Sequence, residues 1–175
     1  MLPFSPHPRL SKTNRRLSVN GAYYPNWRIY RQESPATLQL NRISHVFYAF
    51  AYVKPDGTLY VRVPTPALYL SEADREGQLS DEWADTQMEV DGHKGCLRSF
   101  QALKTGFPHL KVVLSVGGAG KGSEPFAALA GDEQARHRFG DSARDLCVAY
   151  SLDGIDSAYP PPPGLPTETR VELNI

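Results

Sequence analysis

The chain has 175 residues, the length of one domain, and 41% of them are hydrophobic, which is enough to build a buried core. Its 19 basic and 19 acidic residues cancel, so no overall charge favours nucleic acid or an anionic membrane surface as a partner. No apolar run approaches the roughly 20 residues that a membrane span requires.

The first 18 residues are predicted to form a disordered basic leader. They contain four basic side chains and three prolines, but no apolar stretch of about seven residues, so they do not fit a secretory signal. Residues 1–32 lack Asp and Glu, as transit peptides do, yet the prolines oppose the amphipathic helix that such a peptide needs. The localisation is therefore left unknown.

The next part of the chain predicts two strands. Residues 19–24 form a short strand candidate rich in aromatic side chains, and residues 35–41 form a short helix candidate. Residues 44–53 are nearly all apolar or aromatic, which predicts a strand covered on both faces, as in a parallel sheet. Turn residues follow at 54–57. Residues 58–91 are long, polar and without a clear period, and predict an insertion on a βα loop.

Helices and strands continue to alternate after this insertion. Residues 95–105 carry apolar side chains at helical spacing and stop before Gly106 and Pro108, which are helix-ending signals. Residues 111–116 predict the third strand, and the glycines that follow turn away from it. A helix is expected from Ser123 or Glu124, with Pro125 in its first turn.

A further helix is expected after Asp132, with an apolar stripe that includes Phe139, Ala143 and Leu146. Residues 152–156 predict the fourth strand. The four consecutive prolines at 160–163 exclude regular structure, so residues 158–175 are expected to be a Pro-rich irregular tail. The pattern predicts an α/β fold with a parallel sheet and right-handed crossovers, either a small open sheet or one half of an eight-stranded barrel.

Four motifs favour the barrel. They are Val-Asn-Gly-Ala-Tyr-Tyr-Pro-Asn-Trp at 19–27, Ile-Ser-His-Val-Phe-Tyr-Ala-Phe at 43–50, Ser-Val-Gly-Gly at 115–118 and Asp-Gly-Ile-Asp at 153–156. In this order and at these intervals they resemble the first four strands of the family 18 glycoside hydrolases, the chitinases and chitinase-like lectins. The resemblance implies a parallel half of a TIM barrel over residues 19–157, the N-terminal half, with about four βα units of the eight.

The resemblance also implies a reaction. Family members hydrolyse β-1,4-linked N-acetylglucosamine polymers by substrate-assisted, retaining catalysis, without a metal or organic cofactor. A glutamic acid at the fourth strand protonates the glycosidic oxygen, while the N-acetyl oxygen of the substrate attacks the anomeric carbon. Chitin or N-acetylglucosamine oligomers are therefore the implied partners. The family is commonly extracellular.

The catalytic motif of this chain is incomplete. The family pattern is Asp-x-x-Asp-x-Asp-x-Glu, and Asp153 and Asp156 match its first two acids. The third and fourth positions fall on Ala158 and Pro160, and an alignment on the Tyr-Pro pair that often follows the glutamate omits both acids instead. The general acid is therefore predicted to be absent, and the chain to be inactive as written. The alternative role for both aspartates is to cap a turn and accept bonds from backbone amides.

The resemblance also suggests substrate-binding residues. Tyr23, Trp27 and Phe50 resemble aromatic side chains that line sugar subsites, where the apolar faces of a pyranose pack. For Tyr23 and Phe50 the alternative is a place in the barrel core.

The third-strand motif offers a second set. Ser115, Gly117 and Gly118 resemble small residues that let the sugar site form close to the backbone. The alternative is a tight turn that needs glycine conformations.

Two further expectations concern binding without catalysis and the cysteines. A non-catalytic chitin-oligosaccharide-binding, chitinase-like protein is the alternative function, and a half barrel would leave edge strands that permit self-association. Cys96 and Cys147 lack metal-ligand spacing, so no metal site is predicted. Buried thiols are favoured over a disulfide between them, although the sequence does not fix the pairing.

Overall fold

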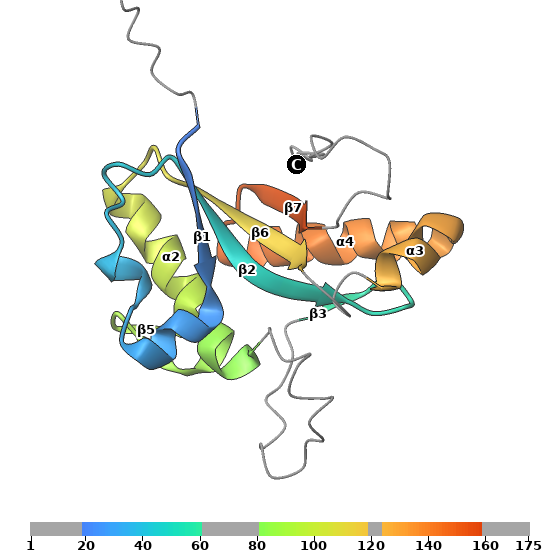
Figure 1. Cartoon of the computed structure of the whole chain (residues 1–175), viewed down its shortest axis with the longest axis horizontal. Coiled ribbons are helices and arrows are strands. Elements are labelled where there is room, and N and C mark those ends of the chain that lie inside the picture. Colours follow the sequence, from blue (N-terminus) through green and yellow to red (C-terminus); the bar gives the residue numbers. More distant parts are fainter. Residues whose placement is uncertain (1–18, 61–80, 119–123, 159–175) are drawn as a thin grey trace, which may run out of the picture.

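A four-stranded parallel sheet forms the centre of the computed structural model, which describes residues 19–60, 81–118 and 124–158. The strand order is β1-β2-β6-β7, as Figure 1 shows. The strands are β1 (Gly21–Pro25), β2 (His45–Val53), β6 (Lys111–Gly117) and β7 (Gly154–Ala158). Consecutive partners pair in parallel. Within the described residues, β1 and β7 are the edges of this sheet.

The central strands are buried because their sequences are apolar on both faces. In β2 all but two residues are buried, and in β6 all but two. The strands expected at 19–24, 44–53 and 111–116 are confirmed within two residues. The fourth, expected at 152–156, is also confirmed within two residues, and β7 begins at Gly154 because the N–H of Leu152 still bonds to the carbonyl of Cys147 and closes the preceding helix.

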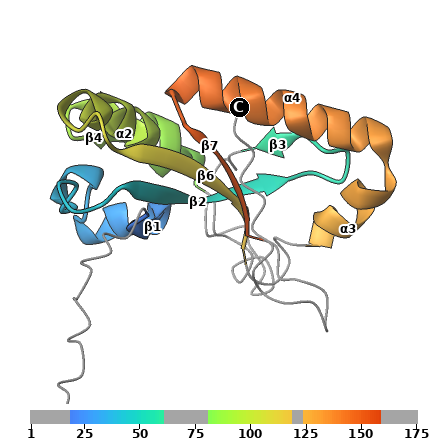
Figure 2. The same cartoon turned by 90° about the horizontal axis from the view of Figure 1, so that it is seen from above.

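Two long helices cover one face of the sheet, as Figure 2 shows. They are α2 (Gly95–Gly106) and α4 (Glu133–Tyr150), and the shorter α3 (Glu124–Gly131) precedes α4. All three were expected from the sequence. The side chain of Asp132 accepts hydrogen bonds from the N–H groups of Gln134 and Ala135, which caps the amino end of α4.

The main core lies between these helices and the sheet. Alternate strand residues point to this face, and the rings of Tyr24 and Tyr48 meet Phe100 of α2 edge-on, with centroids 5.1 and 5.9 Å apart. Each fully buried large apolar side chain contributes about 1.5–3 kcal/mol. The core therefore fixes the strands in register and sets the positions of the residues on the opposite face.

Several short elements differ from the sequence expectation. The helix expected at 35–41 is only the 3-10 turn η2 (Pro35–Thr37), because Leu38 is already extended. The 3-10 helix η1 (Asn26–Arg31) was not predicted. Neither was β3 (Leu59–Tyr60), which pairs antiparallel with the end of β2.

The described end of the insertion predicted at 58–91 also contains regular structure. It holds the π-helix η4 (Trp83–Gln87), followed by a hairpin of β4 (Glu89–Val90) and β5 (His93–Lys94). Asp91 and Gly92 turn the hairpin with positive φ of 51° and 79°. An Asp-Gly pair is a known hairpin signal, so the sequence contained this information.

Some expectations fall outside the described residues, namely the basic leader at 1–18 and, beyond Ala158, the Pro-rich tail. Cys96 and Cys147 are buried free thiols. Within the described residues, no helix is both long and apolar enough to cross a bilayer.

Candidate functional site

Three of the predicted site residues meet at one carboxylate. The hydroxyl of Tyr23 donates to Asp156 Oδ2 over 2.8 Å, and the Ser115 hydroxyl donates to the same oxygen, also over 2.8 Å. The parallel register places Ser115 beside Asp156 on neighbouring strands. Ser115 and Asp156 are buried, whereas Tyr23 is 42% exposed. The result is a polar group on the sheet face opposite α2 and α4, with Tyr23 accessible from solvent.

The first group is held by its apolar neighbours. The ring of Tyr23 stacks on Phe47 of β2, with centroids 5.0 Å apart and planes at 24°. A side chain at Gly21 would place its Cβ only 2.7 Å from the Phe47 ring, so glycine gives that ring its space. The orientation of Tyr23 towards Asp156 is thus fixed by packing as well as by its hydrogen bond.

A second group of predicted residues lies at the carboxyl ends of the strands. Trp27, at the start of η1, faces Phe50 with ring centroids 6.4 Å apart and planes at 30°. A Cβ at Gly118 would lie 3.4 Å from the Phe50 ring. Gly117 and Gly118 both have φ of 101°, a conformation that favours glycine. The register shift in β2 between Ala49 and Ala51 places Phe50 at a bulge beside these glycines.

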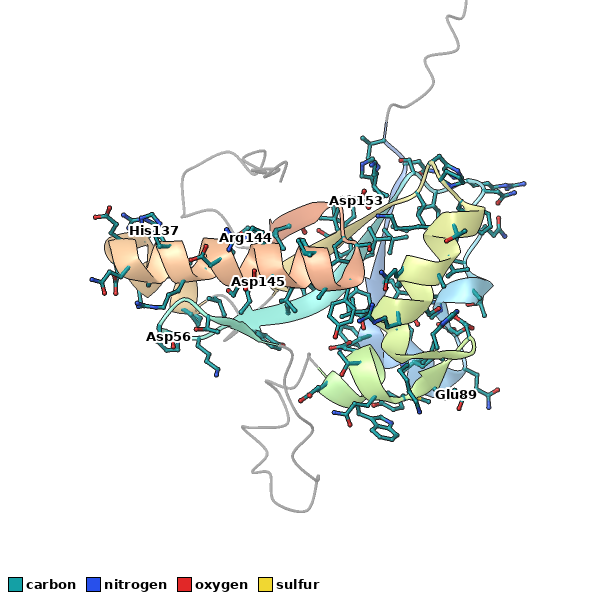
Figure 3. All side chains as sticks on the ribbon, turned by 180° about the vertical axis from the view of Figure 1, so that it is seen from behind. Asp56, Glu89, His137, Arg144, Asp145 and Asp153 are labelled. Atoms are coloured by element: carbon teal, nitrogen blue, oxygen red, sulfur yellow. The ribbon has the colours of Figure 1, made fainter. Side chains whose placement is uncertain are left out.

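The structure does not bring Asp153 to either group. Asp153 precedes the amino end of β7 (Figure 3) and pairs with Lys104 at 2.5 Å and Lys111 at 3.0 Å. Its Oδ2 also accepts the N–H of Val112 over 2.8 Å. Partial burial acts to raise the pKa of Asp153, but the hydrogen bonds from Lys104, Val112 and Lys111 outweigh it, and the pKa is lowered. This carboxylate ties β7 to β6 and α2.

Sequence reasoning missed a buried carboxylate behind the aromatic pair. Asp85 Oδ1 accepts hydrogen bonds from the Asn26 amide, over 3.0 Å, and from the Tyr48 hydroxyl. Both Asp85 and Asn26 are 1% exposed. Burial raises the pKa of Asp85 to about 7, although the hydrogen bonds from Tyr48 and Asn26 act to lower it. Asp85 lies in a polar stretch without periodicity, so no sequence signal pairs it with Asn26.

Two kinds of group are missing from the described part of the site. After Asp156, β7 continues with Ser157 and Ala158, so no carboxyl group follows at the carboxyl end of this strand as far as the structure describes it. Across residues 19–60, 81–118 and 124–158, no three His, Cys, Asp or Glu side chains are grouped to hold a metal ion.

Comparison with known proteins identifies the family. The profile described as Glycosyl hydrolases family 18 matches residues 20–168. The chain belongs to this family. It is 34% identical over 140 residues to Endochitinase 1 of Metarhizium anisopliae, covering 79% of this chain and 30% of that protein. It is 29% identical over 157 residues to Chitinase A1 of Niallia circulans, covering 77% of this chain and 22% of that protein.

Solved structures of family 18 share the fold. Chitinase ChiA74 from Bacillus thuringiensis superimposes with a TM-score of 0.61 at 26% identity, covering 86% of this chain and 29% of that one. A class V chitinase mutant from Cycas revoluta, solved in complex with (GlcNAc)3, gives 0.57 at 22% identity, covering 83% and 36%. The parallel sheet is therefore part of a TIM barrel, and the chain spans about 30% of the length of the curated relatives first matched.

Proposed function

We propose that this family 18 chain carries the chitin-oligosaccharide-binding part of a chitinase-type site and does not itself hydrolyse the glycosidic bond. The observation that carries the proposal is the end of β7, where Asp156 is held by Tyr23 and Ser115 but is followed by Ser157 and Ala158. Relatives of the chain are named endochitinases, and related structures were solved with (GlcNAc)3 or allosamidin bound.

The two groups of side chains suit a sugar polymer in different ways. The tilted pair of Trp27 and Phe50 offers apolar ring faces, which pack well on the C–H faces of a pyranose. Tyr23 and Asp156 offer polar atoms for hydroxyl and N-acetyl groups. Gly117 and Gly118 follow Ser115 along the chain without side chains of their own, and Gly118 lies against the Phe50 ring. A β-1,4-linked N-acetylglucosamine oligomer presents both kinds of surface along its length.

Hydrolysis needs a group that the described part of β7 does not supply. In the substrate-assisted route the N-acetyl oxygen attacks the anomeric carbon, and a carboxylic acid protonates the leaving oxygen. That acid must lie within roughly 2.6–3.2 Å of the oxygen. Glu168 is the next carboxylate in the sequence after Asp156, and four consecutive prolines separate the two. We assign Asp156 to holding and polarising the site. Asp153 is a remnant of the acid motif that anchors β7.

The experiment is to measure binding and turnover on the same protein. Isothermal titration with chitotriose and chitopentaose, together with release of 4-methylumbelliferone from a chitin-oligomer glycoside, reports both. We expect saturable binding without release. Trp27→Ala should abolish binding, while Trp83→Ala, at the other tryptophan, should retain it. Fluorophore release that Asp156→Ala abolishes would overturn the inactive assignment, and absence of saturable binding would overturn the binding function.

We also propose that copies of this chain associate through the strands at the sheet edges. Within the described residues, β1 pairs with β2 alone and β7 with β6 alone. An unpaired edge presents backbone N–H and C=O groups that another strand can bind.

A further inference from the structure

The strongest feature that the proposed function does not use is the buried hydrogen-bond cluster of Asp85, Asn26 and Tyr48. It joins η1, β2 and the π-helix η4, and it shares no residue with the Tyr23–Asp156 group. An unpartnered carboxyl group in such a place would cost several kcal/mol, and even a paired one adds little net stability. A buried polar cluster of this kind contributes more to the orientation of the segments that carry its side chains than to the stability of the fold.

The cluster joins the insertion after β2 to the loop after β1. Asn26 is the first residue of η1 and comes directly after the end of β1. Its Nδ2 donates to Asp85 Oδ1, and the residue before it, Pro25, provides no side-chain cap for η1. Further along η1, the Tyr30 hydroxyl donates to the carboxylate of Asp81. Residues 81–85 therefore hold η1 at two points, four residues apart.

Asp85 itself has a fixed position. Its N–H bonds to the carbonyl of Asp81 over 2.9 Å, and the start of α2 packs tightly against its backbone. A Cβ at Gly95 would come within 2.1 Å of the Asp85 carbonyl oxygen. The Tyr48 hydroxyl, from the middle of β2, donates to the same carboxylate oxygen as Asn26. The carboxylate is thus bonded to the sheet through Tyr48, and the backbone that carries it packs against the start of α2.

We propose that Asp85 is a positioning residue that acts through Asn26 to hold the ring of Trp27 against Phe50 at the sugar-binding edge. Trp27 is the neighbour of Asn26, so the hydrogen bond that fixes the Asn26 side chain also fixes the backbone from which the Trp27 ring projects. The effect on sugar affinity rests on the proposed function, but the effect on the Trp27 ring does not. An aromatic side chain that must stack on a sugar binds best when its orientation is set beforehand.

The test compares two variants that each remove one hydrogen bond to the same oxygen. Asn26→Ala removes the link to Trp27, and Tyr48→Phe removes the link to the sheet but leaves Asn26 in place. The chain has two tryptophans, and both variants are made together with Trp83→Phe so that Trp27 is the one that remains. Acrylamide quenching of Trp27 fluorescence without ligand reports how accessible the ring is. Chitotriose titration reports the affinity for the sugar, and circular dichroism checks the fold.

We expect Asn26→Ala to increase the quenching of Trp27 and to weaken chitotriose binding by about tenfold or more, equivalent to about 1.4 kcal/mol. Tyr48→Phe should leave the quenching close to that of the parent. Asp85→Asn keeps an acceptor oxygen and should also retain the parent quenching. Asn26→Ser, whose hydroxyl is too short to reach Asp85, replaces Asn26→Ala if the latter fails to fold.

Equal quenching of Trp27 in Asn26→Ala and the parent, with the fold retained, would overturn the proposal. So would equal increases in Asn26→Ala and Tyr48→Phe, since that result indicates a general loosening of the core. If the parent binds no chitotriose, the proposed function fails, and the quenching comparison alone still decides whether the hydrogen bond from Asn26 to Asp85 positions Trp27.

Discussion

Asp153 and Asp156 belong to the same sequence motif, but their surroundings give them different chemistry. Asp156 lies on the sheet face opposite α2 and α4 and accepts two hydroxyl donors. Asp153 precedes the strand and is surrounded by two lysines and a backbone amide. The carboxyl ends of barrel strands carry the active site, whereas their amino ends serve stability. The position of each aspartate relative to β7 therefore distinguishes the roles of the two more clearly than the motif does.

Asp85 makes the stability of the chain depend on pH. Burial raises its pKa from 3.8 to about 7. Between these values the folded chain holds a proton that the unfolded chain has released, so stability falls as pH rises from about 4 to about 7, by at most about 1.4 kcal/mol per pH unit. Tyr48 and Cys96 face the same cluster and stay neutral, because their pKa values lie well above this window. The charge of Asp81 also acts to raise the pKa of Asp85.

We expect Asp85→Asn to remove this loss of stability with rising pH. Urea unfolding at half-unit steps from pH 4 to pH 7.5 should show the variant gaining stability relative to the parent as pH rises. Asp145→Asn, at an exposed position on α4, is the matched control and should follow the parent. An Asp85→Asn curve parallel to that of the parent would show that Asp85 titrates at its ordinary pKa.

Among the helices and strands, the sequence predicted those whose apolar side chains recur at a regular spacing. The apolar run that became β2 and the stripes of α2 and α4 specify their elements directly, because burial on one or two faces leaves a repeating pattern. The 3-10 helix η1 and the π-helix η4 leave no such pattern. Their geometry depends on tertiary contacts, above all the Asn26–Asp85 hydrogen bond, which joins residues 59 positions apart.

The same limit applies to the candidate site. The motifs predicted Tyr23, Ser115 and Asp156 as site residues, and the structure brings them together. Their role in binding stays a prediction. Asp85 was not among the candidates, because a buried acid in a polar insertion resembles any exposed one until the fold is known.

The turn between β2 and β3 docks on α4, which explains how a short hairpin is held. Arg138 donates to the carbonyl of Asp56 over 2.5 Å, and the N–H of Leu59 donates to the Ser142 hydroxyl over 3.0 Å. Figure 3 shows Asp56 at this turn, close to α4. Gly57 has φ of 94°, and a Cβ there would lie 2.0 Å from the Ala135 carbonyl oxygen.

Gly57→Ala is therefore expected to destabilise the chain by roughly 2 kcal/mol or more, from backbone strain and from displacement of the turn. Gly140→Ala is the matched control, since it lies inside α4 and its added Cβ would meet no atom within 4 Å apart from its own helix backbone and chain neighbours. That variant should gain up to about 1 kcal/mol from helix propensity. Thermal unfolding of both variants checks the pair, and a Gly57→Ala chain as stable as the parent would show that the turn does not need its contact with α4.

At the scale of the whole molecule, the arrangement of the sheet explains both the site and the edges. In a parallel sheet the carboxyl ends of all strands lie along the same edge. At this edge Trp27, Phe50 and Gly118 meet. The sheet face opposite α2 and α4 carries Tyr23 and Asp156. In a closed barrel, that face lies inside and the edge strands are paired. In the described residues of this chain, β1 and β7 remain the edges.

Pairing between copies is the expected consequence of these edges. Sedimentation velocity over a wide concentration range should show a reversible shift from monomer towards dimer as concentration rises. Ser157 is exposed on β7, and a lysine on an edge strand opposes pairing through its charge and its hydration, so Ser157→Lys should shift the equilibrium towards monomer. Gln134→Lys adds the same charge at an exposed position on α4 and should leave the equilibrium unchanged. A monomer at every concentration would contradict edge pairing. Equal effects of the two lysines would show that net charge, rather than the β7 edge, controls association.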